Sequence, residues 1–215
     1  MLTWIMVGTG PVDPNFGVTG SFKSSGSPNN RGYVLDRYGS PVFYQNKNFG
    51  FTLINDQLDE WKLDEKSTNP QREVLEDITP GERVEVRDAG LRRGRGIRVA
   101  LLICEDFGQP EEFMKDLKRI GVSLILTPVF AKPFLGKYPF PHGASDRYAL
   151  KIGAWVVVAN SLVVGRAQGI TGPLPIFARG GPPPLGEAGW VMQWDPKECN
   201  EADEVVFLEI PIDRS

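Results

Sequence analysis

Residues 97–160 alternate apolar, strand-like runs with segments of helical character, and this alternation constrains the fold more than any other feature of the chain. Gly121 stands where a helix C-terminal cap is expected, directly before the second apolar run. A strand–helix–strand–helix–strand order predicts a layered α/β fold. The expected strands are 97–103, 122–126 and 155–159, and the expected helices are 110–120 and 144–152.

Hairpins flank this central region. A turn of sequence YGSP (38–41) separates two short strand-like runs, and a Gly/Arg-rich turn precedes the strand at 97. These additions predict a mixed rather than a purely parallel sheet. The flanking strands are expected at 2–7, 32–36, 42–45, 83–86 and 204–210. Two segments rich in Gly and Pro, 11–31 and 178–190, are predicted to be loops. The strand expected at 122–126 is predicted to stop at Thr127-Pro128.

Size and charge limit the classes of function. A chain of 215 residues fits one domain, 1–215, and a formal net charge of −3 gives no indication of a nucleic acid or membrane surface as the main partner. No apolar stretch approaches the roughly 18 residues that a membrane-spanning helix needs. Two cysteines do not make a disulfide framework, so a cytoplasmic location is predicted. The single histidine, His142, excludes a multi-histidine metal site, and no metal is expected.

Cys104 is the first candidate for chemistry. The sequence VALLICEDFGQP (99–110) runs from a buried strand to the thiol, and a polar turn and a helix start follow directly. Open α/β folds present nucleophiles to a cleft from such strand tips. The competing interpretation is that Cys104 packs as a small apolar side chain, because cysteine is among the most buried residue types.

Lys47 is the second candidate. It follows the returning strand of a hairpin in the sequence FYQNKNFGF (43–51), among aromatic residues. A desolvated lysine in such a place can stabilise a developing oxyanion. The alternative is a surface lysine whose aliphatic stem lies over aromatic rings.

Taken together, ordered motifs over nearly the whole chain resemble the nitrilase, or carbon–nitrogen hydrolase, superfamily. The Lys47 hairpin is followed by a Pro-Gly loop, then by the cysteine motif with Pro110-Glu111 at the family's usual spacing. The motifs are YVLDRYGSPVFYQNKNF (33–49), ITPG (78–81), ICED (103–106), GVSLILTP (121–128), SDRYALKIGAWVVVANS (145–161) and EVVFLEIPID (204–213).

This resemblance implies an α-β-β-α sandwich that forms a homodimer and a hydrolase that cleaves a small-molecule amide or nitrile without a cofactor. It makes Cys104 the nucleophile of a thioester intermediate. Lys47 and the backbone N–H of Glu105 would then bind the oxyanion. A supporting glutamate belongs shortly before the Pro-Gly loop, where Glu73 and Glu76 both stand, and Glu73 is the predicted candidate.

The chain also departs from the family pattern. The family's general-base glutamate lies before the lysine hairpin, and this chain has no glutamate before Lys47, as if the first strand–helix–strand elements were missing. Whether the chain is an enzyme is therefore left open. The alternatives are an inactive interaction module and an acyltransferase. Gly108 replaces a common arginine, and the aromatic loop 128–143, with Phe130, is expected to line the substrate pocket or to pack in the core or a dimer contact.

Overall fold

The computed structural model describes residues 4–12, 27–54, 58, 73–89, 96–129, 144, 147–149, 151–160, 177–179 and 191–193. The expected final strand 204–210, the turn 90–95 and most of the loop 128–143 therefore lie outside them. None of the described helices is long and apolar enough to cross a bilayer.

A mixed sheet forms the centre of the described part of the molecule. Its strands lie in the order β11-β10-β9-β8-β7-β6. The three central strands, β7 to β9, are parallel, and antiparallel strands flank them on both sides. The bounds are Val86–Ala89 (β6), Ile97–Leu101 (β7), Leu124–Val129 (β8), Trp155–Asn160 (β9), Phe177–Arg179 (β10) and Val191–Gln193 (β11).

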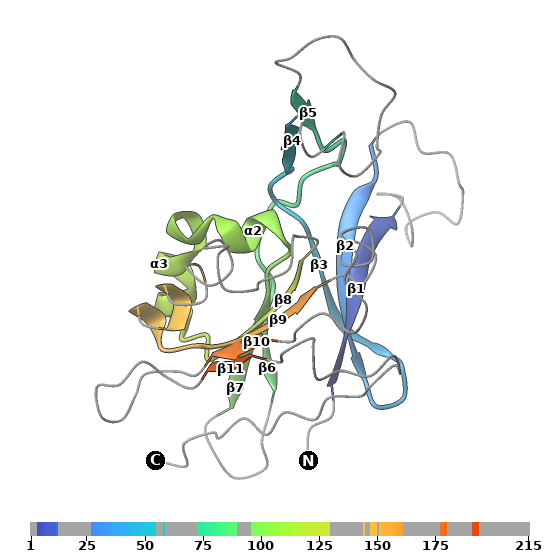
Figure 1. Cartoon of the computed structure of the whole chain (residues 1–215). Coiled ribbons are helices and arrows are strands. Elements are labelled where there is room, and N and C mark those ends of the chain that lie inside the picture. Colours follow the sequence, from blue (N-terminus) through green and yellow to red (C-terminus); the bar gives the residue numbers. More distant parts are fainter. Residues whose placement is uncertain are drawn as a thin grey trace.

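A second sheet packs against the first. Strands β1 (Trp4–Val12), β2 (Asn29–Asp36) and β3 (Pro41–Asn46) form an antiparallel meander, and β1 contacts β8 of the larger sheet. A short antiparallel pair, β4 (Thr52–Ile54) and β5 (Glu73–Leu75), projects beyond the end of β3 (Figure 1).

Helices cover the other face of the larger sheet, among them α2, α3 and the helical residues 147–149, so that helices, large sheet and small sheet form successive layers (Figure 1). The single-turn helix α2 spans Glu105–Gly108, and α3 spans Pro110–Ile120. Proline at the first position and two acidic residues in the first turn favour the start of α3. Gly121 ends it in the left-handed conformation at φ 78°, with its N–H bonded to the carbonyls of Leu117 and Lys118.

Side-chain alternation along β7 divides the core into two clusters. Ala100 and Leu102 face the helices, together with Phe107 and Tyr148, whose rings stack with centroids 5.3 Å apart. The intervening residues of the strand, with Val34 and Phe43 of the small sheet, fill the space between the sheets. A two-residue period on a strand buried on both faces explains this arrangement. The predicted α/β class with a mixed sheet is confirmed.

Several element boundaries differ from the sequence predictions. The strand expected to stop before Thr127 continues to Val129, because Pro128, which has no N–H, still accepts a hydrogen bond from Cys104 through its carbonyl. The strand expected at 83–86 begins only at Val86. Upstream of it, the carbonyl of Arg83 and the N–H of Glu85 bind the buried side-chain amide of Gln45 at 2.7 Å each instead of a neighbouring strand.

Both predicted Gly/Pro-rich loops, 11–31 and 178–190, also contain strand residues. β1 continues through Gly8 and Gly10 to Val12, because a bulge between Val7 and Gly10 absorbs the irregularity. β2 begins at Asn29 within the segment expected to be a loop. β10 includes residues 178–179, since pairing with β9 supplies the hydrogen bonds that a Gly/Pro-rich neighbourhood does not predict.

Candidate functional site

Lys47 is buried and held at three points. Its side chain is 2% exposed, and its ammonium forms an ion pair with Glu76. Its backbone N–H donates to the carbonyl of Asn30 (2.8 Å), and its own carbonyl accepts from the N–H of Gly81 (2.7 Å). The alternative of a surface lysine is therefore wrong: Lys47 lies inside the protein at the end of β3.

Glu76 is the carboxylate that meets this ammonium. It follows β5 directly, and it also accepts hydrogen bonds from the side-chain amide of Asn30 (2.8 Å) and the N–H of Phe51 (3.1 Å). Burial acts to raise the pKa of Glu76, but the hydrogen bonds from Lys47 and Asn30 outweigh burial and hold the pKa below its ordinary value of 4.5. Glu76 is therefore ionised at neutral pH.

Glu73, the predicted supporting acid, lies elsewhere. It is the first residue of β5, where it pairs with Ile54, and its side chain is exposed. The ion pair of Lys47 is with Glu76. The geometry thus favours Glu76 over Glu73, because the acid that reaches Lys47 comes from the residue just after the strand.

Cys104 occupies a strained turn between β7 and α2. Its φ of 47° and ψ of −103° make it the one non-glycine residue with positive φ among the residues described. The N–H of Cys104 donates to the carbonyl of Pro128 (2.9 Å), and its carbonyl accepts from Phe107 (3.0 Å). Backbone strain of this kind persists where surrounding bonds enforce it and is common at nucleophiles on strand-to-helix turns.

The burial of Cys104 bears on both interpretations of this residue, as a nucleophile and as a packed structural cysteine. It packs against the apolar cluster between the sheets, as a structural cysteine does. It is nevertheless partly exposed, whereas the neighbouring Ile103 is completely buried. Reactive cysteines are partly exposed, and inert ones are sealed in the core.

Asp106 joins the Lys47 and Cys104 segments. It lies two residues after Cys104, is fully buried, and accepts the backbone N–H groups of Asn48 (2.9 Å) and Phe49 (2.8 Å). Burial raises the pKa of Asp106 to about 6, although these hydrogen bonds and the charge of Lys47 act to lower it. The end of β3 and the cysteine turn are thus in direct contact.

Glu105 and Phe130 complete the predicted site residues. Glu105 is the first residue of α2, and its carboxylate accepts a hydrogen bond from the side-chain amide of Gln109 (2.6 Å). Phe130 and His142 lie outside the described residues. Within the described ranges, no group of three or more His, Cys, Asp and Glu side chains is arranged to hold a metal ion.

The Pro-Gly loop packs directly on the lysine segment. A Cβ added to Gly81 would lie 2.7 Å from the carbonyl oxygen of Asn46 and 2.8 Å from Oδ1 of Asn48. Only a glycine fits against these two neighbours of Lys47. This close approach explains why the ITPG motif ends in a glycine.

Replacing Gly81 with alanine should lower the free energy of unfolding by about 2 kcal/mol, because the backbone must move away from the end of β3. Denaturant unfolding measures this loss. Gly96→Ala is the matched control, since its nearest contact would be a carbonyl oxygen at 3.9 Å. Equal stability of the two variants would contradict the close packing of the loop.

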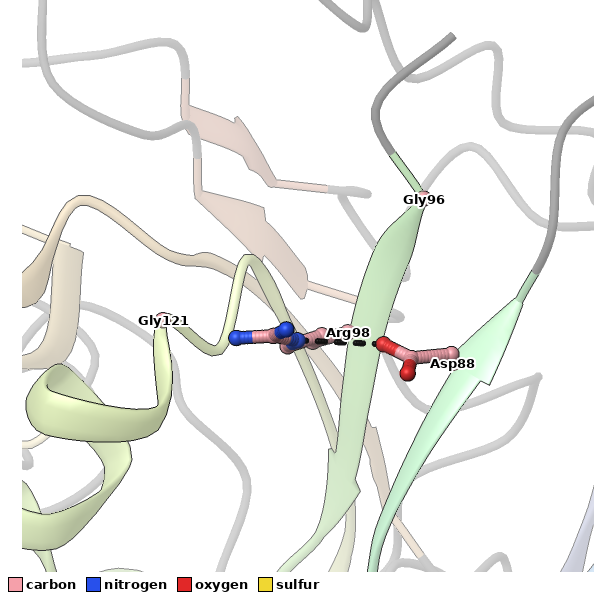
Figure 2. A pocket seen from close by; sticks show the side chains of 4 residues that line it. All are labelled: Asp88, Gly96, Arg98 and Gly121. Atoms are coloured by element: carbon pink, nitrogen blue, oxygen red, sulfur yellow. Dashed lines mark hydrogen bonds and ion pairs between the residues drawn. The ribbon is translucent and has the colours of Figure 1, made fainter. Parts of the chain in front are cut away.

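A separate hollow of about 550 Å³ is lined by Asp88, Gly96, Arg98 and Gly121. Arg98 crosses it, donating to Asp88 at 3.1 Å and to the carbonyl of Ile120, as Figure 2 shows for the Asp88 bond. Gly96 precedes β7, whereas Cys104 follows its carboxyl end. Ligands of open α/β sheets bind at the carboxyl ends of the strands, so this hollow is not the candidate site.

Comparison with solved structures identifies the class of fold. The chain has the fold of nitrilase-superfamily amidases, as the sequence motifs imply. A cysteine-to-alanine variant of the amidase from Nesterenkonia AN1 superposes with a TM-score of 0.55 at 16% identity, over 88% of this chain and 57% of that one. No protein-family model and no curated protein sequence matches the chain.

A second structure of the same Nesterenkonia amidase, a glutamate-to-glutamine variant, carries the acetamide moiety of fluoroacetamide covalently added at its active-site cysteine. It superposes with a TM-score of 0.52 at 16% identity, over 91% of this chain and 62% of that one. The chain thus spans about three fifths of the length of the amidase structures that it resembles.

Sequence reasoning missed the part that Asp106 plays. The residue was visible in the ICED motif, but no role followed from the motif alone. A usable signal was its position: a carboxylate two residues after the cysteine that ends an apolar strand lies close to the core, and a buried carboxylate needs hydrogen-bond donors. Those donors come from Asn48 and Phe49, on a segment distant in the sequence.

Proposed function

We propose that this chain is a carbon–nitrogen hydrolase that cleaves a small-molecule amide through a covalent thioester on Cys104. The observation that carries this proposal is the direct contact, through Asp106, of the strained cysteine turn with the end of β3 that bears the buried Lys47. The nitrilase-superfamily fold and the family motifs support it.

Each candidate residue has a role in this reaction. The Cys104 thiolate adds to the amide carbonyl carbon, and the Lys47 ammonium and the N–H of Glu105 bind the oxyanion that forms. The C–N bond then breaks, and the amine leaves with the proton that the Cys104 thiol gave up on forming the thiolate. Water attacks the thioester, which releases the carboxylic acid and restores the thiol. Glu76 keeps the Lys47 charge paired between turnovers.

A second candidate function is a module that forms a covalent adduct but does not turn over. The observation that favours it is the state of the carboxylates around the site. Glu76 binds Lys47, Glu105 binds Gln109, and Asp106 binds backbone N–H groups. Among the described residues next to the candidates, none of these three carboxylates is left to act as the general base that deacylation needs.

Mass spectrometry of the intact protein after incubation with fluoroacetamide, combined with an assay for ammonia release from simple amides, tests both functions. Fluoroacetamide should alkylate Cys104 by displacement of fluoride. Cys104→Ala should remove the adduct, whereas Cys199→Ser, at the other of the chain's two cysteines, should not. An adduct together with ammonia release supports the hydrolase. An adduct without ammonia release supports the second function, and the absence of an adduct contradicts both.

Nitriles as substrates, the homodimer, the single domain 1–215 and the cytoplasmic location stay predictions. Transfer of the acyl group to an amine instead of water would use the same thioester. The ratio of carboxylic acid to N-alkyl amide formed during amide turnover in the presence of a simple primary amine distinguishes the two, because a hydrolase gives mainly the acid and an acyltransferase mainly the N-alkyl amide.

A further inference from the structure

Asp106 lies at the start of α2, but its carboxylate forms several hydrogen bonds with the segment that follows Lys47. One carboxylate oxygen accepts the N–H groups of Asn48 (2.9 Å) and Phe49 (2.8 Å). The other accepts the same Asn48 N–H at 3.1 Å and the Asn48 side-chain amide at 3.3 Å. The carboxylate therefore binds the two residues that directly follow Lys47, across sequence separations of 58 and 57 positions.

These contacts leave Asp106 poorly suited to take a proton from a substrate. Both of its oxygens already accept hydrogen bonds, and its side chain is completely buried. The titratable groups that face it are Lys47, from the end of β3, and Tyr148, whose pKa is raised by burial and by the charge of Asp106. The hydrogen-bond donors to the Asp106 carboxylate among the described residues are instead the backbone and side-chain amide N–H groups of Asn48 and Phe49.

We propose that Asp106 is a positioning residue, which holds the Lys47 ammonium at the Cys104 turn by binding the N–H groups of Asn48 and Phe49. The proposal rests on the proposed function, because it assigns Asp106 to the site in which Lys47 and Cys104 act together. An asparagine at this position would keep one acceptor oxygen and turn an NH₂ group toward the N–H donors. The end of β3 would then lose hydrogen bonds, and Lys47 would move away from Cys104.

The rate of Cys104 alkylation by iodoacetamide, measured as a function of pH, tests this role without any need for amide turnover. A nearby ammonium favours the thiolate, which is the reactive form. Asp106→Asn should therefore slow alkylation about tenfold at pH 7 and move the rate profile to higher pH by about one unit. A purely electrostatic role predicts the opposite sign, because removal of a negative charge beside the thiol favours the thiolate.

A double-mutant cycle with Lys47→Met shows whether Asp106 acts through Lys47. The double variant should react no more slowly than Lys47→Met alone. Asp116→Asn on α3, which removes an exposed carboxylate paired with Arg119, is the control and should alkylate at the wild-type rate. Faster alkylation of Asp106→Asn, a wild-type profile, or effects that multiply in the double variant would each overturn the proposal.

A measurement on the wild-type protein covers the case in which Asp106→Asn does not fold. The amide proton shifts of Asn48 and Phe49 should titrate together with the Asp106 carboxyl group, and the alkylation rate of Cys104 should change in the same pH range. Two amides that do not titrate, or an alkylation rate that does not follow them, would contradict positioning by Asp106. Neither result depends on whether the chain hydrolyses an amide.

Discussion

Lys47→Met is expected to slow acylation of Cys104 by about 10²–10³-fold, the usual cost of removing one oxyanion donor. Methionine keeps much of the length and the apolar stem of lysine but has no ammonium. The burst of p-nitrophenolate released from p-nitrophenyl acetate measures the step, because the thiolate attacks the acetyl carbonyl and the phenolate leaves. This burst does not require hydrolysis of the thioester, so a chain that fails to deacylate still reports it.

The comparison of acylation with alkylation isolates the oxyanion role of Lys47. Displacement of fluoride from fluoroacetamide forms no oxyanion, so Lys47→Met should slow alkylation only about tenfold, through the thiolate fraction. Lys115→Met, which removes an exposed lysine of α3, is the matched control. Equal losses in the two reactions would assign Lys47 to thiol activation alone, and an unchanged burst would remove it from the mechanism.

The burial of Lys47 explains why its replacement is expected to slow acylation so strongly. An ammonium with 2% exposure retains little hydration, so its field acts on nearby charge more strongly than that of a surface lysine. Glu76 compensates this charge in the resting protein, and its side chain is 26% exposed. In this pair, the ammonium of Lys47 therefore lies in the interior and the carboxylate of Glu76 lies closer to solvent.

The elements with a strong local pattern could be predicted from the sequence. The helix after Pro110 has a proline start, acidic first turn and glycine cap within its own residues, and the structure confirms it. The turn at Gly39, with φ 81°, and the strands on both sides of it are equally local. Such signals do not depend on distant parts of the chain.

Elements that depend on tertiary partners could not be predicted in this way. β4 and β5 are three residues each, and their side chains are mostly exposed, so neither shows a usable period. The extension of β8 through Pro128 depends on the N–H of Cys104. The late start of β6 depends on Gln45, which binds residues 38 and 40 positions away in the sequence.

The same distinction between local signals and tertiary contacts applies to the candidate site. Residue type and position in a motif were sufficient to nominate Lys47 and Cys104. The choice between Glu73 and Glu76 was not accessible, because it depends on the residue at which a three-residue strand ends. The contact between Asp106 and the lysine segment joins residues 58 positions apart, and no local pattern encodes it.

Glu76→Gln is expected to lower the free energy of unfolding by about 3 kcal/mol at pH 7, because it leaves the buried Lys47 ammonium without a counter-charge. Glutamine retains the shape and one acceptor oxygen, so the loss reports the charge rather than packing. The pKa of Glu76 is lowered in the folded protein, so its carboxylate stabilises the fold above its ordinary pKa of 4.5 and loses this effect as the pH falls through the folded value. The difference between variant and wild type should therefore shrink as the pH falls below 4.5.

Glu73→Gln is the matched control for this prediction, since it makes the same chemical change three residues earlier on an exposed side chain. Its free energy of unfolding should stay within about 0.5 kcal/mol of the wild type at every pH, as for most surface substitutions. Urea denaturation at pH 7 and at pH 4 separates the two variants. A large loss for Glu73→Gln with none for Glu76→Gln would reassign the partner of Lys47, because only the carboxylate that faces a buried ammonium can show both the loss and its decrease in acid.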